Sequence, residues 1–169
     1  MKKIIFVILS LCLTASAIIA GNRNLDTENI INTISEYRHV SGIHVISVGK
    51  LGIGLARVAG YLSVESEKDK AALAILNDIN KVVVVNYEDA IAAKQKELNS
   101  KLSALFNDAE KILEVKEEDN IVNIYGTSVN RGESIDDMMI FIPKDYTLVC
   151  VLGSISAERI ADIIKVAND

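Results

Sequence analysis

The sequence predicts an α+β domain with one mixed, mostly antiparallel sheet of about six strands and helices packed on it. Apolar residues recur at helical spacing in the N-terminal half and again near the C-terminus. The run Val82–Val85 is typical of a strand, because β-branched side chains suit the pleat of a sheet. Short polar links separate the apolar segments of Lys111–Gly153, which predicts an antiparallel meander.

The N-terminal half is expected to contain three helices and two strands. Asp26 or Thr27 can cap the first helix, and Ile30 and Ile34 lie on one of its faces. The helix before the valine run carries an apolar stripe that ends at Ile79. In order, the expected elements are a helix over Asp26–Tyr37, a strand over Gly42–Val48, a helix over Lys50–Leu62, a helix over Ser66–Asn80 and a strand over Lys81–Tyr87.

The C-terminal half is expected to hold one long helix, the meander and a closing helix. In order, these are a helix over Glu88–Asp108, strands over Lys111–Lys116, Ile121–Val129, Ile135–Ile142 and Tyr146–Gly153, and a helix over Ser156–Ala167. The long helix should bury its apolar stripe, which comprises Ile91, Leu98, Leu102, Leu105 and Phe106. The first two strands of the chain, each followed by a helix, are expected to form a parallel crossover unit.

Several expected strands lack a polar face. Ile140 and Ile142 alternate with Met139 and Phe141, and the segment Leu148–Leu152 is apolar throughout. Both faces of such a sheet must be covered. Helices of the same chain can cover both faces, or one face can meet a partner subunit.

The first twenty residues predict a secretory signal peptide. Lys2 and Lys3 precede the apolar run Ile4–Leu13, and small residues follow. Cleavage is expected after Ala17 or Ala20, which leaves 21–169 as a single domain. An uncleaved membrane anchor is the alternative, since the segment from Ile4 is free of charge as far as Ala20.

Cleavage would change both charge and cysteine content. Loss of Lys2 and Lys3 lowers the 18 basic residues to 16 against 23 acidic ones, and takes the net charge from −5 to −7. An acidic chain without a basic cluster argues against nucleic acid as a partner. Cys12 would leave with the signal, and bulky Leu11 before it argues against a lipid anchor. Cys150 would then be the single cysteine, buried in a strand.

A glycine-rich segment follows the first expected strand. Gly49-Lys50-Leu51-Gly52-Ile53-Gly54 invites comparison with phosphate-binding loops, which need glycines at a helix start. The lysine-containing phosphate loop is absent, and Arg57 stands where the dinucleotide fingerprint requires glycine. We therefore expect small residues where a helix packs closely on the sheet.

Other candidates for chemistry lack partners at suitable spacing. His39 and His44 have no cysteine or carboxylate cluster beside them, and a metal site needs three or four ligands. The acidic runs Glu117-Glu118-Asp119 and Asp136-Asp137 do not fit a calcium loop and are expected to be solvated turns or strand ends. The sequence thus assigns no catalytic, cofactor-binding or metal-ligating residue.

Several of these segments together resemble a known family. They are the helix leading into Lys81-Val82-Val83-Val84-Val85-Asn86-Tyr87-Glu88, the strand Leu113-Glu114-Val115-Lys116 with the strands after it, and the ending Leu148-Val149-Cys150-Val151-Leu152-Gly153-Ser154-Ile155. Over Ile30–Ala167 this pattern is similar to the domain of unknown function 4252 family, small exported proteins and lipoproteins of Bacteroidetes-type bacteria. The resemblance implies an envelope location and an α+β fold. It carries no activity and no functional residue.

These observations predict an exported, non-catalytic protein of the cell envelope, periplasmic or extracellular. It would bind an unknown envelope protein or associate with itself, and would contact membrane only if the N-terminal segment stayed attached. A small periplasmic hydrolase and a carrier of a small apolar ligand are the alternatives. No cofactor is expected.

Overall fold

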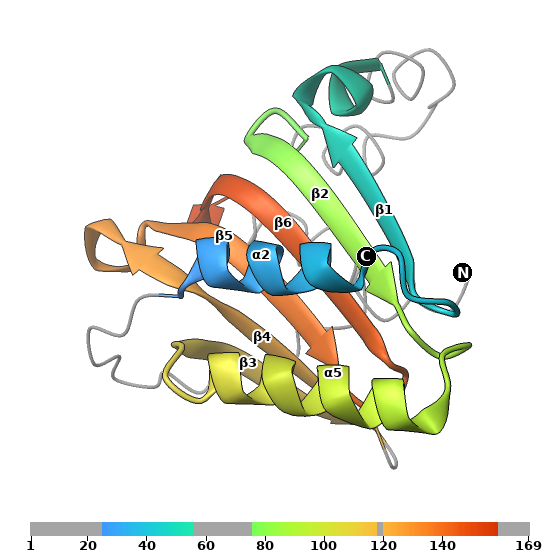
Figure 1. The fold of residues 1–169 in the computed structure, drawn as a ribbon. Helices are drawn as coiled ribbons and strands as arrows, with labels where there is room; N and C mark the ends of the chain where they lie inside the picture. The colour runs from blue at the N-terminus through green and yellow to red at the C-terminus, as the bar shows by residue number, and fades with distance from the viewer. Residues whose placement is uncertain (1–24, 56–75, 118–119, 159–169) are drawn as a thin grey trace.

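A computed structural model describes residues 25–55, 76–117 and 120–158. They form one antiparallel six-stranded sheet with strand order β1-β2-β6-β5-β4-β3, and α2 and α5 lie across one face of it (Figure 1). The α+β prediction is confirmed. The elements are α2 (Thr27–Tyr37), β1 (His44–Gly49), β2 (Ile79–Asn86), α5 (Ala92–Phe106), β3 (Lys111–Glu117), β4 (Asn120–Val129), a 3₁₀ turn η1 (Asn130–Gly132), β5 (Ser134–Ile142) and β6 (Thr147–Ser156).

Helix α2 forms as its sequence predicts. The Asp26 carboxylate accepts a hydrogen bond from the Asn29 backbone N–H at 3.0 Å, which caps the helix start. Ile30 and Ile34 are buried against the sheet, as expected from their spacing, and Tyr37 is buried in the last turn.

The pairing of the first two strands differs from the prediction. β1 and β2 run antiparallel, with Ile46 opposite Val84 and Val48 opposite Val82, so the expected parallel crossover is wrong. The chain segment between them, residues 50–78, is long enough to return the chain to either end of β1. Apolar content alone does not decide which direction the second strand takes.

The predicted meander is confirmed. β3, β4, β5 and β6 pair in order, and each pair is antiparallel. β6 also pairs with β2, so the last strand joins the meander to the antiparallel pair β1–β2. This insertion makes β6 a central strand, which explains why its residues from Leu148 to Val151 are buried on both faces.

The sheet has two apolar faces, each with its own buried cluster. The helix-covered face packs against α2 and α5, and its members include Val83, Val85, Leu148, Cys150, Met139 and Phe141. The opposite face includes Val122, Ile124, Ile140, Ile142, Val149 and Val151, with Ile53 packed among them. Both faces of the central strands are therefore buried within the chain itself.

Several predicted boundaries are corrected. Ile79 and Asn80 belong to β2 and not to the end of a helix, because Ile79 pairs with Gly153 and buries its side chain in the opposite-face cluster. α5 begins at Ala92 rather than Glu88, after a turn in which the Ala90 N–H donates to the Tyr87 carbonyl at 3.3 Å. Ile91 consequently precedes the helix and is 70% exposed, contrary to its expected place in the core.

Other predicted helices are described only in part. The helix expected from Lys50 begins there and is described as far as Leu55. Of the helix expected over Ser66–Asn80, residues 66–75 lie outside the described residues, and 76–78 form a turn. The closing helix begins at Ala157, because Ser156 is the last residue of β6, and residues from 159 onward lie outside the described part, as does the signal segment 1–20.

Candidate functional site

The two histidines do not form a site with each other. His39 lies in the turn after α2 and is exposed. His44 begins β1, and its Nε2 atom lies 3.3 Å from Asp89 Oδ2, with both side chains largely exposed. In residues 25–55, 76–117 and 120–158 there is no group of three metal-ligating side chains.

The glycine-rich segment spans the end of β1 and a helix start. Gly49 ends β1, and the chain is helical from Lys50. A Cβ atom on Gly52 would lie 2.9 Å from Val48 Cγ1, whereas one on Gly49 or Gly54 would meet nothing within 4 Å. Close packing therefore accounts for Gly52 alone among these glycines.

Cys150 is a core residue. It is fully buried in β6 and makes no disulfide. Burial raises the pKa of its thiol from 9.0 to about 12, so the thiol stays protonated and unreactive at neutral pH. The reading of Cys150 as a packing residue is consistent with this environment.

The acidic pair on β5 lies at an irregularity of the sheet. The β5–β6 register shifts between Asp136 and Met138, and Asp137 has a positive φ of 50°. The Asp137 carboxylate accepts a hydrogen bond from the Gly153 N–H at 3.1 Å, so it holds the bulge in place. Glu118 and Asp119 of the other acidic run lie outside the described residues.

The two edges of the sheet differ in chemistry. β3 carries Lys111, Glu114 and Lys116, with Nζ–carboxylate distances of 2.7 Å and 3.5 Å to Glu114. Charged side chains, lysine above all, discourage other strands from pairing with an edge. β1 carries no lysine, arginine or carboxylate along its length. In the part of the chain that the structure describes, β1 has no strand on its outer side.

Apolar side chains are exposed along and just after β1. We call Ile46, Val48, Leu51 and Leu55 the β1 surface. Ile46 is 60% exposed, Leu51 87% and Leu55 73%. A folded domain rarely leaves several large apolar side chains this exposed at one place on its surface. Ile53, on the other side of the same helical turn, is buried in the opposite-face cluster, which fixes the direction of Leu51 and Leu55.

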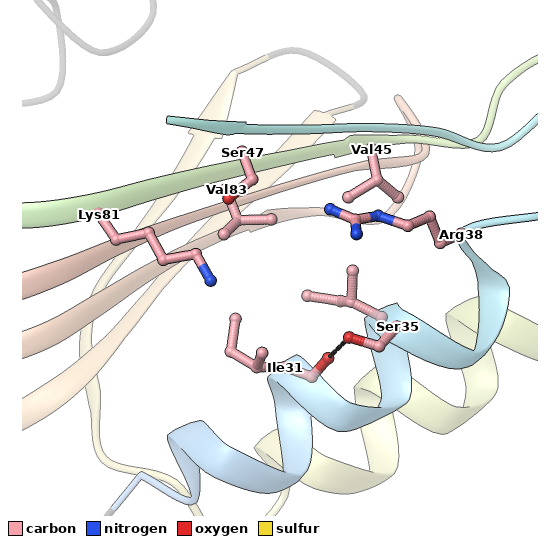
Figure 2. A pocket seen from close by; sticks show the side chains of 8 residues that line it. Ile31, Ser35, Arg38, Val45, Ser47, Lys81 and Val83 are labelled. Atoms are coloured by element: carbon pink, nitrogen blue, oxygen red, sulfur yellow. Dashed lines mark hydrogen bonds between the residues drawn. The ribbon is translucent and has the colours of Figure 1, made fainter. Parts of the chain in front are cut away.

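A hollow lies beside β1 on the helix-covered face, between α2 and the sheet (Figure 2). Its enclosed volume is about 30 Å³, and the rest of the hollow is open to solvent. Figure 2 shows the Lys81 side chain reaching from β2 toward α2 and the Arg38 guanidinium lying beneath Val45. The lining residues are Ile31, Ile34, Ser35, Arg38, Val45, Ser47, Lys81 and Val83.

Sequence reasoning did not find this hollow or the β1 surface. Arg38 follows a helix and Lys81 precedes a valine run, far apart in the sequence, and only the fold brings them to one place. For β1, the lack of lysine, arginine and carboxylate from His44 to Gly49 is a usable signal once the strand is known to lie at an edge.

The fold defines a class of protein: a small α+β domain with an open antiparallel sheet. The family model for the domain of unknown function DUF4252 matches residues 42–163. The chain belongs to this family, as its strand pattern suggested, although α2 precedes the matched residues. No curated protein and no solved structure matches the chain. Within the described residues, no helix is both long enough and apolar enough to cross a bilayer.

Proposed function

We propose that this chain is an exported, non-catalytic protein of the cell envelope that binds an extended strand of another polypeptide along β1. One observation carries the proposal: β1 is an edge strand without lysine, arginine or carboxylate, and exposed apolar side chains flank it. An open edge presents backbone N–H and C=O groups that a partner strand can pair with, and neighbouring side chains supply specificity.

The contrast between the edges supports this choice. The same chain protects β3 with ion-paired lysines and places no lysine, arginine or carboxylate on β1. Ile46 and Val48 lie opposite Val84 and Val82, so the apolar surface that they expose continues the buried opposite face out to the edge. A strand added at β1 would extend that face and remove Ile46 from water.

Export rests on the N-terminal segment. Two lysines, a ten-residue apolar run and the small residues Ala15-Ser16-Ala17 support a cleaved signal peptide. Mass spectrometry of the protein from its host should find a chain that starts at Ile18 or Gly21. The intact chain, with Met1 and free in the cytosol, would contradict export.

Binding is tested by a photo-crosslinking residue placed in living cells. Benzoylphenylalanine at position 46 should give a discrete adduct, because the partner strand covers this side chain. Position 121 is the matched control, since Ile121 is an exposed isoleucine near the opposite, charged edge. An adduct of twice the chain mass identifies a second copy, and any other mass a different protein.

The result that would overturn the proposal is equally specific. Position 46 would then give no adduct above the level at position 121, and the purified protein would sediment as a monomer. We do not develop the hydrolase alternative, because among the described side chains no catalytic arrangement supports it.

A further inference from the structure

We propose that the hollow between α2 and β1 is a binding site for a carboxylate carried on a short aliphatic body. This inference does not rest on the proposed function, because the hollow lies on the helix-covered face whereas Ile46 and Val48 face the other way. It rests on two converging cations, an apolar floor and the small size of the hollow.

The cations enter the hollow from different elements. Arg38 follows the last turn of α2, and Lys81 belongs to β2, opposite Gly49 at the end of β1. Both side chains reach into the space between helix and sheet in Figure 2. A carboxylate there can take paired hydrogen bonds from the guanidinium and a charge-assisted bond from the ammonium group.

Neither cation is neutralised within the described residues. Lys94, Lys101, Lys111 and Lys116 each have a carboxylate within 3.5 Å, in a chain whose net charge is −5. Among the described side chains, none places a carboxylate within ion-pairing distance of Arg38 or Lys81. In so acidic a chain, two cations that converge on an apolar hollow are an arrangement suited to an anion.

Both cations should be needed together. Arg38 stands at the C-terminal end of α2, where the carbonyl groups make the potential negative. That position suits a cation but repels an anion, so the guanidinium alone has to offset the helix end before it attracts a ligand. Lys81, on the sheet side, supplies the second positive charge that an anion requires.

The remaining lining defines the rest of the ligand. Ile34 and Val83 are buried, Ile31 and Val45 are partly buried, and together they give the hollow an apolar floor. The Ser35 hydroxyl donates to the Ile31 carbonyl at 2.8 Å, which leaves it able to accept but not to donate toward an anion. The enclosed volume is only about 30 Å³, so it admits one small group such as a carboxylate or a methyl, and the rest of a short aliphatic body would lie along the open, apolar part of the hollow.

Two sources can present this chemistry, a free branched-chain acid and the C-terminal residue of a peptide. The test is an amide NMR titration of the purified protein with 4-methylpentanoate, with N-acetyl-alanyl-leucine, with the neutral 4-methylpentanamide and with inorganic phosphate. Both carboxylates should give saturable shifts at Ser35, Ser47 and Val83. Tighter binding of the dipeptide identifies a chain end, and equal binding a free acid.

Matched variants make the result specific. Arg38→Gln and Lys81→Gln should each weaken carboxylate binding by about tenfold, the loss expected for one charge-assisted contact. Lys96→Gln, at an exposed lysine of α5 away from the hollow, should leave binding unchanged. The amide spectra show directly that each variant is folded.

Three results would overturn the inference. One is the absence of saturable shifts in the lining residues with either carboxylate. Another is binding of 4-methylpentanamide or of phosphate as tight as that of the carboxylates. Equal binding of the amide would show that the site does not require a charge, and equal binding of phosphate would show that it does not require an aliphatic body. The third is unchanged binding in both Arg38→Gln and Lys81→Gln.

Discussion

At the scale of single residues, Gly42 shows where the backbone itself is constrained. It has a φ of +78°, and a Cβ atom there would lie 2.2 Å from the Asp89 carbonyl oxygen. Only glycine tolerates both the left-handed conformation and this close approach. The turn that leads α2 into β1 therefore depends on it.

Replacing Gly42 by alanine should lower the free energy of unfolding by at least about 2 kcal/mol, because strain and a backbone clash add together. Gly54→Ala is the control: it lies in a helical segment with nothing within 4 Å and should stabilise by about 0.5–1 kcal/mol. Urea unfolding monitored by circular dichroism measures both. Equal effects of the two substitutions would show that the turn is not constrained as described.

Cys150 gives a pH dependence whose sign follows from its burial. The folded pKa of about 12 lies above the ordinary 9.0, so the thiol's contribution to stability is complete below pH 9 and is lost as the pH rises toward 12. The slope approaches about 1.4 kcal/mol per pH unit in this window. Buried Tyr87, whose pKa burial also raises, adds to the loss above pH 10.

Urea unfolding at pH 8, 9 and 10 tests this. The parent protein should lose more stability between pH 9 and 10 than Cys150→Ala, even though the substitution leaves a small cavity and lowers stability at pH 8. A thiol reagent at pH 8 should label Cys150 only after urea is added. The same pH slope in both proteins, or rapid labelling without urea, would show that the thiol is accessible.

At the scale of elements, the sequence predicted most strands and the N-terminal helix well. β4 and β5 agree with prediction to within a residue at each end, because each is an apolar segment of strand length bounded by polar turns. The direction of each strand and its neighbours in the sheet could not be predicted from the same local pattern. The predicted parallel β1–β2 unit was wrong, because the apolar pattern of a strand encodes neither its direction nor its neighbour: β2 runs antiparallel to β1 and pairs with β6 on its other side.

Helix α5 shows how tertiary context overrides periodicity. Ile91 continues the apolar stripe in sequence, yet the turn after Tyr87 places it before the helix and in solvent. Tyr87 is fixed there because its hydroxyl donates to Asn99 Oδ1 at 2.6 Å and its N–H to the Tyr146 carbonyl at 3.0 Å. The candidate sites were harder still, since the β1 surface and the hollow exist only once distant residues are assembled.

Substitutions along this stripe separate the two kinds of position. Leu98→Ala removes a fully buried side chain and should cost roughly 2–5 kcal/mol of unfolding free energy. Ile91→Ala, at a side chain that is 70% exposed, should change it by less than about 0.5 kcal/mol. Chemical denaturation measures both, and a large loss for Ile91→Ala would mean that this residue packs in the core after all.

At the scale of the whole molecule, α2 and α5 cover one face of the sheet, and the other face carries a second buried apolar cluster. Ion-paired side chains protect the β3 edge from pairing with other strands. The β1 edge lacks such ion-paired lysines. Ile46 and Leu51 are exposed at this edge, and the hollow lined by Arg38 and Lys81 also lies beside β1. We therefore propose that this protein binds its partners around β1.

Amide hydrogen exchange tests that claim most directly. The protein is compared alone, at a concentration where it is monomeric, and in the complex captured through position 46. The account predicts that the outward-facing amides of β1 exchange rapidly in the monomer and become protected in the complex, while the amides of β3 at the other edge keep their rates. Unchanged exchange in β1, or new protection along β3 instead, would contradict it.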